Sequence, residues 1–228
     1  MHHFKNYIPA RKKNGEWLSN QAIVIYALIN MHTYGHSGLP FYNISIDCIG
    51  MELYDVDTLT TRQRQNVRDG FKMLMECFPD AIIPVNEKKT VWKVDVDKFS
   101  NIDDDYQYAY CYNEDFMNVL HIQDSRTYSL AGFYVKFLST FDYRYSVGRL
   151  SLDYIAKIME VSITTIKTHI DKIKKVGAIK TYRGTTKKCS KGEYMSHPNI
   201  YYRPYEEKLA TDYMENDMIH YFRNSQSP

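Results

Sequence analysis

The feature that most constrains the fold is a heptapeptide that occurs twice in altered form. Residues 44–50 read Ile-Ser-Ile-Asp-Cys-Ile-Gly, and residues 150–156 read Leu-Ser-Leu-Asp-Tyr-Ile-Ala. Both place Ser before an apolar residue and Asp, and both end on Ile and a small residue. In the second copy, Ser151 is the expected N-cap of a helix from residue 152 to residue 159. The chain is therefore predicted to contain two related units, each with a short helix at this position.

A longer helix follows the second heptapeptide. The apolar residues Ile166, Ile170 and Ile173 are spaced by four and three, which is one face of an α-helix. Ser162 is its expected N-cap, and Gly177 suits the left-handed turn that ends a helix. These signals predict a helix from about residue 163 to residue 176.

The first unit repeats this pattern. Val67, Phe71 and Leu74 have the same spacing, behind a cap at Thr60 or Thr61. Each unit also has an apolar helix upstream and two strand candidates downstream. The upstream helices are expected at 22–29 and 128–140, and the strands at 81–85 and 90–96 in the first unit and at 179–182 and 200–205 in the second. Three helices and a hairpin are thus expected twice.

The two copies differ in the spacing of their helices. The offset is 106 residues between Asp47 and Asp153 but 99 residues between Val67 and Ile166. The first copy therefore has seven extra residues, which we place between 54 and 61. Its turn is expected to be longer than that of the second copy.

The segments outside the two units differ in composition. We expect five segments: a basic N-terminal arm (1–16), a first domain (17–98), an acidic and aromatic connector (99–125), a second domain (126–205), and a C-terminal helix and tail (206–228). The arm is either a flexible basic extension or an ordinary solvated terminus. The connector is rich in tyrosine and reads as packed rather than floppy. The C-terminal helix either packs on its own domain or makes a homodimer contact.

Charge is sorted along the chain. The formal net charge is only +2, but residues 151–203 hold eleven Lys and Arg against four Asp and Glu. Residues 95–124 hold eight acidic residues and one Lys. A basic C-terminal half favours a polyanionic partner. The acidic middle segment is not expected to contact that partner.

Other classes of protein lack support in the sequence. The four cysteines form no CxxC pair, so neither a zinc ribbon nor a disulfide framework is expected. No signal peptide is evident, and the longest apolar run, 22–29, is too short for a bilayer. A cytoplasmic location, associated with nucleoid or plasmid, is therefore expected. No P-loop or GxSxG motif occurs, so we expect no enzymatic activity, no catalytic residue and no cofactor. His32 and His36 lack a third ligand, so no metal is expected.

The stretch from residue 150 to 179 resembles the winged helix-turn-helix superfamily. The resemblance rests on the series Ser162, Thr165, Ile166, Ile170, Ile173, Gly177 and Ile179. More loosely, the layout is similar to replication initiators of plasmids and phages from low-GC Gram-positive bacteria, which often open a helix as Leu18-Ser19 does here. The resemblance implies a mainly α fold with small β-hairpin wings (α+β), built from tandem winged helix-turn-helix domains.

The same resemblance implies a function. It implies sequence-specific binding of double-stranded DNA, as a replication initiator or replisome organiser of a plasmid or phage. The alternatives are a transcriptional regulator, such as a repressor, of a mobile element, and a winged-helix interaction module that does not bind DNA. The partners would be duplex DNA and replication or transcription machinery, with no membrane.

The third helix of a helix-turn-helix lies in the major groove, and its exposed residues meet base edges. In the first unit the expected contacts are Arg62, Gln63, Arg64, Gln65 and Arg68. In the second they are Ser162, Thr164, Thr165, Lys167, Thr168 and Lys172. The wings supply cations for phosphates, which give affinity without sequence information. These are Lys88 and Lys89 in the first unit, and Arg183, Lys187, Lys188 and Lys191 in the second.

Overall fold

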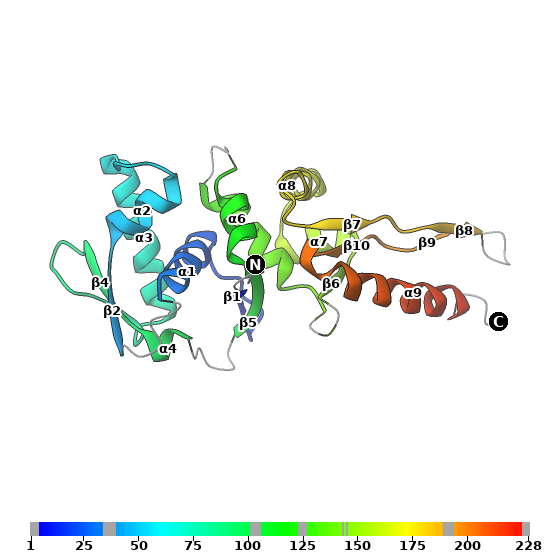
Figure 1. Cartoon of the computed structure of the whole chain (residues 1–228), viewed down its shortest axis with the longest axis horizontal. Coiled ribbons are helices and arrows are strands. Elements are labelled where there is room, and N and C mark those ends of the chain that lie inside the picture. The colour runs from blue at the N-terminus through cyan, green and yellow to red at the C-terminus, as the bar shows by residue number, and fades with distance from the viewer. Residues whose placement is uncertain are drawn as a thin grey trace. The chain divides into compact units, whose positions relative to one another are not determined.

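The computed structural model divides the chain into two compact units, Met1–Ser139 and Thr140–Pro228. The structure describes residues 5–33, 40–100, 106–122, 127–142, 144, 146–188 and 194–224. Both units combine helices with small sheets, so the fold is α+β, as predicted (Figure 1). Each unit is described by itself.

Unit 1 contains a three-stranded sheet packed on three helices. Its elements are α1 (Asn20–Thr33), β2 (Phe41–Ser45), α2 (Ile46–Tyr54), α3 (Thr61–Cys77), β3 (Ile82–Pro84) and β4 (Val91–Asp95), followed by the short α4 (Val96–Ser100). The strand order is β2-β4-β3, and both pairings are antiparallel. Helix α1 is buried along its whole apolar run from residue 22 to residue 29. It therefore forms the centre of this core.

Close packing between α1 and α3 requires a glycine. A Cβ placed on Gly70 would lie 2.7 Å from Cγ1 of Ile25. The next residue of α3, Phe71, stacks on Trp92 of β4, with ring centroids 5.2 Å apart. The helix periodicity at Val67, Phe71 and Leu74 thus marks the buried face, as the sequence predicted.

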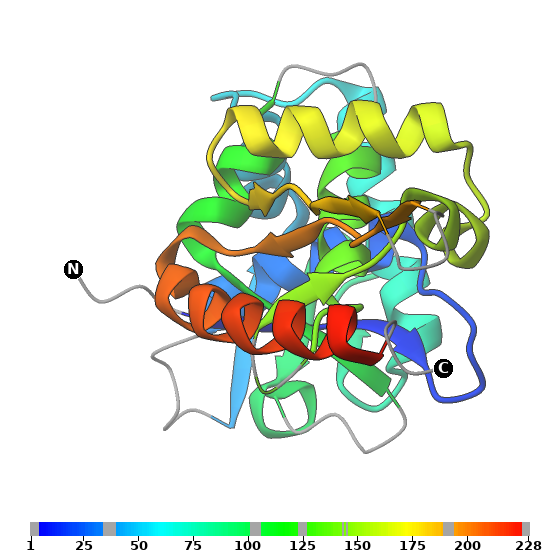
Figure 2. The ribbon, with the colours of Figure 1, turned by 90° about the vertical axis from the view of Figure 1, so that its right-hand side faces the viewer.

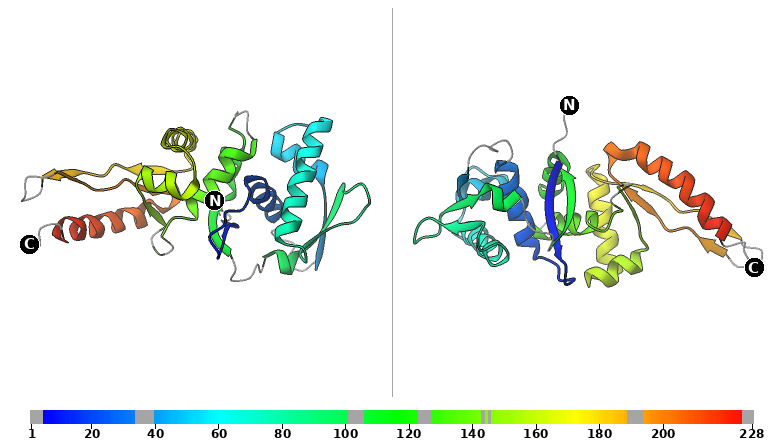
Figure 3. Two further views of the ribbon diagram at one scale, coloured as in Figure 1. Left: turned by 180° about the vertical axis from the view of Figure 1, so that it is seen from behind. Right: turned by 90° about the horizontal axis from the view of Figure 1, so that it is seen from below.

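The N-terminal residues form a strand rather than a free arm. β1 (Lys5–Lys12) pairs antiparallel with β5 (Tyr106–Tyr112), and Lys5 lies opposite Tyr112. The inward side chains Asn6 and Ile8 are buried, as are Ala109 and Cys111 on the other strand. The two strands lie side by side (Figure 3), and burial of this face holds β1 in place. The predicted connector is therefore a structural part of unit 1.

Two further helices complete unit 1. α5 (Asn113–Leu120) packs on α6 (Thr127–Leu138), and α6 packs on α1. α5 begins at Asn113, and Tyr112 holds the cap position without a side-chain hydrogen bond. A Cβ on Gly132 would lie 2.5 Å from Cβ of Asn20, so α6 and α1 approach closely.

Helix α6 marks the largest difference from the predicted domain boundaries. The sequence assigned residues 128–140 to the second domain, whereas the compact units divide after Ser139. The described side chains of α6 are buried on nearly every side. An apolar helix without a polar face carries no periodic signal that tells which core it joins.

Unit 2 repeats the element order of unit 1 after its first helix. Its elements are β6 (Val147–Arg149), α7 (Leu152–Met159), α8 (Ile163–Lys175), β7 (Lys180–Tyr182), β8 (Thr186–Lys188), β9 (Tyr194–Ser196), β10 (Ile200–Tyr202), the 3-10 turn Pro204–Glu206 and α9 (Glu207–Asn224). The strand order is β6-β10-β7, and β8 pairs with β9 beyond it (Figure 2). Strand, helix, helix and two strands thus follow in the same order in both units. The sequence missed β2 and β6.

The C-terminal helix packs on its own unit. Ala210 of α9 is fully buried with Val147, Ile200 and Tyr202, and Tyr213 adds to this cluster. Of the two interpretations of this helix, packing is thus found for its first half. The described side chains do not include the second half, where the homodimer prediction stays untested.

Candidate nucleic-acid interface

The repeated heptapeptide builds the same helix start in both units. The side chain of Ser45 accepts a hydrogen bond from the backbone N–H of Cys48 at 3.0 Å. Ser151 accepts one from the N–H of Tyr154 at 3.1 Å. Both serines are N-caps, which confirms the prediction for Ser151 and extends it to the first copy. The shared Ile of each heptapeptide is fully buried.

The two helices also end alike. Asp55 and Glu160 follow α2 and α7 in the left-handed conformation, with φ of 52° and 54°. Their N–H groups donate to the carbonyl oxygens of Met51 and Ala156. Neither residue is glycine, so a sequence search for Gly would not find these turns. Both units therefore turn from the second helix in the same way.

The seven extra residues of the first copy lie in three places. The connection to the third helix spans residues 55–60 in unit 1 and 160–162 in unit 2, a difference of three. Three more extend the start of α3 ahead of Val67, and α2 is one residue longer than α7. The turn is longer, as predicted, but by fewer residues. Leu59 fills it, against Gly50 and Val67.

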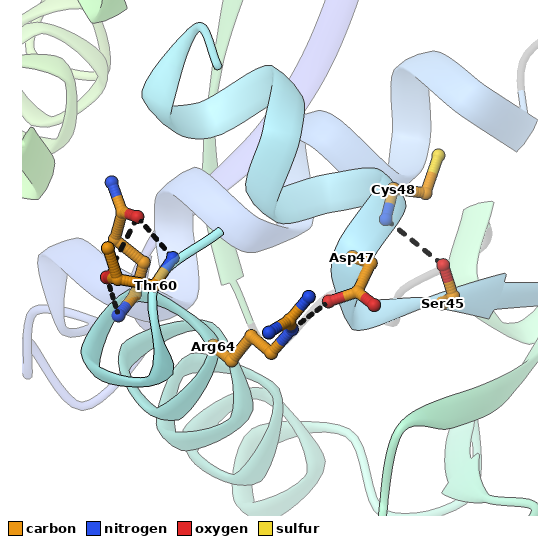
Figure 4. Close-up of polar contacts among 6 residues, drawn as sticks. Ser45, Asp47, Cys48, Thr60 and Arg64 are labelled. Carbon is orange, nitrogen blue, oxygen red and sulfur yellow. Dashed lines mark hydrogen bonds and ion pairs between the residues drawn. The ribbon is translucent and has the colours of Figure 1, made fainter. Parts of the chain in front are cut away.

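The predicted base-reading side chains of α3 bond mostly within the chain (Figure 4). Gln63 closes a capping box with Thr60. Arg64 reaches from α3 to α2, where its Nε lies 2.8 Å from Oδ1 of Asp47. Four of the five predicted α3 contacts are therefore bonded within the chain, because Gln65 and Arg68 also bond to each other.

The next turn of α3 is bonded along its own surface. Gln65 donates to Asp69 at 2.8 Å and accepts from Arg68 at 2.7 Å. Lys72 lies 3.2 Å from the same Asp69 carboxylate. Arg62, in the added first turn, is exposed and has no ion-pair partner among the described residues. It is the α3 cation most available to an external anion.

Helix α8 presents a different surface. Ser162 caps it, with its Oγ accepting from the N–H of Thr165 at 3.1 Å. Thr164, Lys167 and Thr168 are exposed, and their spacing places them on one face opposite the buried isoleucines. Within the described residues, Lys167 has no ion-pair partner. The structure therefore brings these predicted residues together on one accessible face.

The second half of α8 adds cations that the predicted set lacked. Lys172 is half-buried, whereas Lys174 and Lys175 are exposed in the last turn, with Asp171 the single acid of the helix. Tyr154 on α7 is 51% exposed and was also missed. Tyr154 precedes the buried Ile155 by one residue, and a helix turns by about 100° per residue, so the helical period could have predicted that Tyr154 points away from the core.

The turn between β3 and β4 is short and internally bonded. Lys88 is exposed there, whereas Lys89 is half-buried. Lys89 has a φ of 51° and donates its N–H to the carbonyl of Asn86 at 2.9 Å. The Oδ1 of Asn86 accepts the N–H of Thr90 at 2.9 Å. Of the two predicted wing cations of unit 1, Lys88 is thus the accessible one.

The corresponding loop of unit 2 is a longer hairpin. Strands β7 and β10 continue into β8 and β9, and Arg183 is exposed between the two pairs. The backbone of Lys187 and Lys188 lies in β8, and Lys191 falls outside the described residues. The paired strands β8 and β9 extend away from the three-stranded sheet of unit 2 (Figure 1).

The ionisable groups elsewhere suit structural roles. Nε2 of His32 lies 2.6 Å from Oε2 of Glu52, and this bond raises the pKa of His32. Burial lowers the pKa of Lys136 to about 8. His36 lies outside the described residues, and the described part of the chain holds no group of three potential metal ligands. Nor does it contain a helix long and apolar enough to cross a bilayer.

A scan of protein-family models and a search of curated proteins found no match to this chain. The element order and the surface chemistry of the two units are therefore the basis for a functional proposal.

Proposed function

We propose that this protein binds double-stranded DNA sequence-specifically through two winged helices. The observation that carries this proposal is the shared strand order, β2-β4-β3 and β6-β10-β7, around two consecutive helices. In both, the last strand lies between the first two, so that the loop before it forms a wing. In the chain, α1 precedes the strands and helices of the first set (β2 to β4), and α6 precedes those of the second set (β6 to β10). This is the order of a winged helix-turn-helix.

Helix α8 would lie in the major groove. Thr164, Lys167 and Thr168 face outward from its first two turns, where helices of this type meet base edges. Lys174 and Lys175 extend the positive surface towards its end. Arg183 and the lysines of the β8–β9 hairpin would neutralise phosphates.

Unit 1 has features that also favour a second function, protein binding. Its third helix uses Gln63 and Arg64 for contacts within the chain. The outer face of its sheet exposes Phe41 by 47%, Ile83 by 48% and Val85 by 56%. Exposed apolar patches often mark interaction surfaces. A protein with one DNA-binding unit and one partner-binding unit is consistent with a role in recruiting other factors.

The resemblance noted from the sequence supports a replication initiator or replisome organiser of a plasmid or phage. A transcriptional regulator of a mobile element is the alternative role. Both roles would place the protein in the cytoplasm at its DNA, without enzymatic chemistry of its own. They differ in whether the bound site lies at an origin or a promoter.

Selection from a random-sequence duplex pool tests the proposal. The full chain should enrich a common motif, and its affinity for that duplex should fall steeply between about 50 and 200 mM salt through counterion release. Footprinting would then show the length of the protected site. Failure to retain any duplex at low salt would exclude DNA binding and leave the interaction module.

A further inference from the structure

We infer that α8 recognises the C5-methyl groups of thymine in the major groove. This inference rests on the proposed DNA binding and specifies which base feature unit 2 reads. Two observations support it: most hydroxyl groups on the exposed face of α8 are bonded within the chain, and apolar atoms at the start of the helix are exposed.

The hydroxyl groups of this face are largely engaged. Oγ of Ser162 accepts the N–H of Thr165 and lies 2.8 Å from Oγ1 of the same residue. Oγ1 of Thr168 donates to the carbonyl oxygen of Thr164 at 2.9 Å. With its proton given to the helix backbone, Thr168 has no donor left for a base. Its methyl group is the part that it offers outward.

Apolar atoms are exposed at the start of the same helix. Ile163 is 38% exposed and Val161, in the turn before it, is 37% exposed. Ile163 and Lys167 are four residues apart and thus neighbours on the helix surface. From Val161 to Ile170 the chain has no carboxylate to accept from cytosine, and Lys167 is its one Lys or Arg. Methyl groups therefore make up much of what this face offers to a base edge. Thymine is the only base of ordinary DNA that presents a methyl group in the major groove.

Helix α3 provides the contrast within the same chain. Its corresponding surface carries amide and guanidinium groups, such as Gln65 and Arg68, and acidic Asp69. The two helices therefore do not read the same feature. The apolar reading belongs to α8 alone.

Modified duplexes test this directly. We would compare alternating d(AT) with d(AU), which lacks only the thymine methyl, and alternating d(GC) with its 5-methylcytosine form, which adds a methyl at the equivalent place. Each methyl buried by α8 should change affinity by about fourfold. Tighter binding to both methylated duplexes supports the inference. Equal binding of each pair overturns it while leaving DNA binding intact, and no binding to any duplex at low salt removes the proposed function as well.

Two substitutions of one residue assign the effect to α8. Thr168→Val keeps the methyl and loses the hydroxyl, whereas Thr168→Ser does the reverse; circular dichroism checks that both variants fold. We expect Thr168→Val to retain the preference for d(AT) over d(AU) and Thr168→Ser to lose part of it. The opposite order would show that the hydroxyl is what reads DNA. Ile163→Ala should reduce the preference independently, and an unchanged preference in both Thr168→Ser and Ile163→Ala would also overturn the inference.

Discussion

Gly184 is the residue at which a single methyl group should open the long hairpin of unit 2. A Cβ at this position would overlap the carbonyl oxygen of His197, and would lie 2.6 Å from its carbonyl carbon and 2.9 Å from the oxygen of Pro198. All of these are backbone atoms, so no side chain can rotate away. Gly184→Ala therefore requires the two arms of the hairpin to separate.

The cost follows from the bonds at this point. The N–H of Gly184 donates to Oδ1 of Asn199 at 3.2 Å, and the N–H of His197 donates to the carbonyl of Thr185 at 2.9 Å. Two lost hydrogen bonds at about 1 kcal/mol each, with about 1–3 kcal/mol for overpacking, give a destabilisation of about 3–5 kcal/mol. The hairpin should open locally at this cost.

Gly177→Ala is a matched control. Gly177 has a φ of 78° and no atom within 4 Å of a Cβ, so its substitution costs only the strain of a left-handed alanine, about 1–2 kcal/mol. Hydrogen–deuterium exchange of peptides covering 180–202 measures the opening, with peptides covering 106–120 of unit 1 as an internal reference. We expect lost protection across the hairpin in Gly184→Ala. Wild-type protection there, or a larger effect from Gly177→Ala, would refute the close approach.

Three further outcomes are expected. Lys167→Ala should reduce the salt dependence of duplex binding by about one phosphate contact, or roughly 3.5-fold in affinity between 50 and 200 mM, whereas Lys72→Ala should not; equal slopes for the two variants would count against α8 as the contact. The pKa of His32 is raised by Glu52, so this bond should stabilise unit 1 fully below the ordinary histidine pKa and lose its effect as pH rises through the raised value; the difference in Tm between wild type and His32→Ala should therefore shrink with rising pH, and a constant difference would contradict it. Ser151→Ala should destabilise unit 2 by about 1 kcal/mol in urea unfolding through loss of the N-cap, an effect that Ser151→Asp should spare.

The local part of the fold could be predicted from the sequence. Ser162, the three isoleucines of α8 and Gly177 are signals within one helix, and the structure places each as expected. Features that depend on distant partners could not be predicted. The pairing of β1 with β5 joins residues about a hundred positions apart, and the short strands β2 and β6 carry too few residues for a periodic pattern.

The candidate interface shows the same division. Exposure of Thr164 and Lys167 followed from the helical period. The ion pair between Arg64 and Asp47 could not be predicted in this way, because it joins two helices whose packing the sequence does not reveal. Residue type alone indicated five base contacts on α3, whereas bonds within the chain engage four of these side chains.

The pairing of β1 with β5 has a consequence for synthesis of the chain. β1 leaves the ribosome before its partner strand, which ends at Tyr112, so Ile8 and Ala10 have no sheet to join until that segment has also emerged. The β1–β5 sheet therefore closes only after the intervening helices of unit 1 have been made. A fragment that begins at Trp17 would leave β5 with an open edge, of the kind that recruits other chains. Pairing with β1 thus covers one edge of β5 that stays open in the nascent chain until both strands are available.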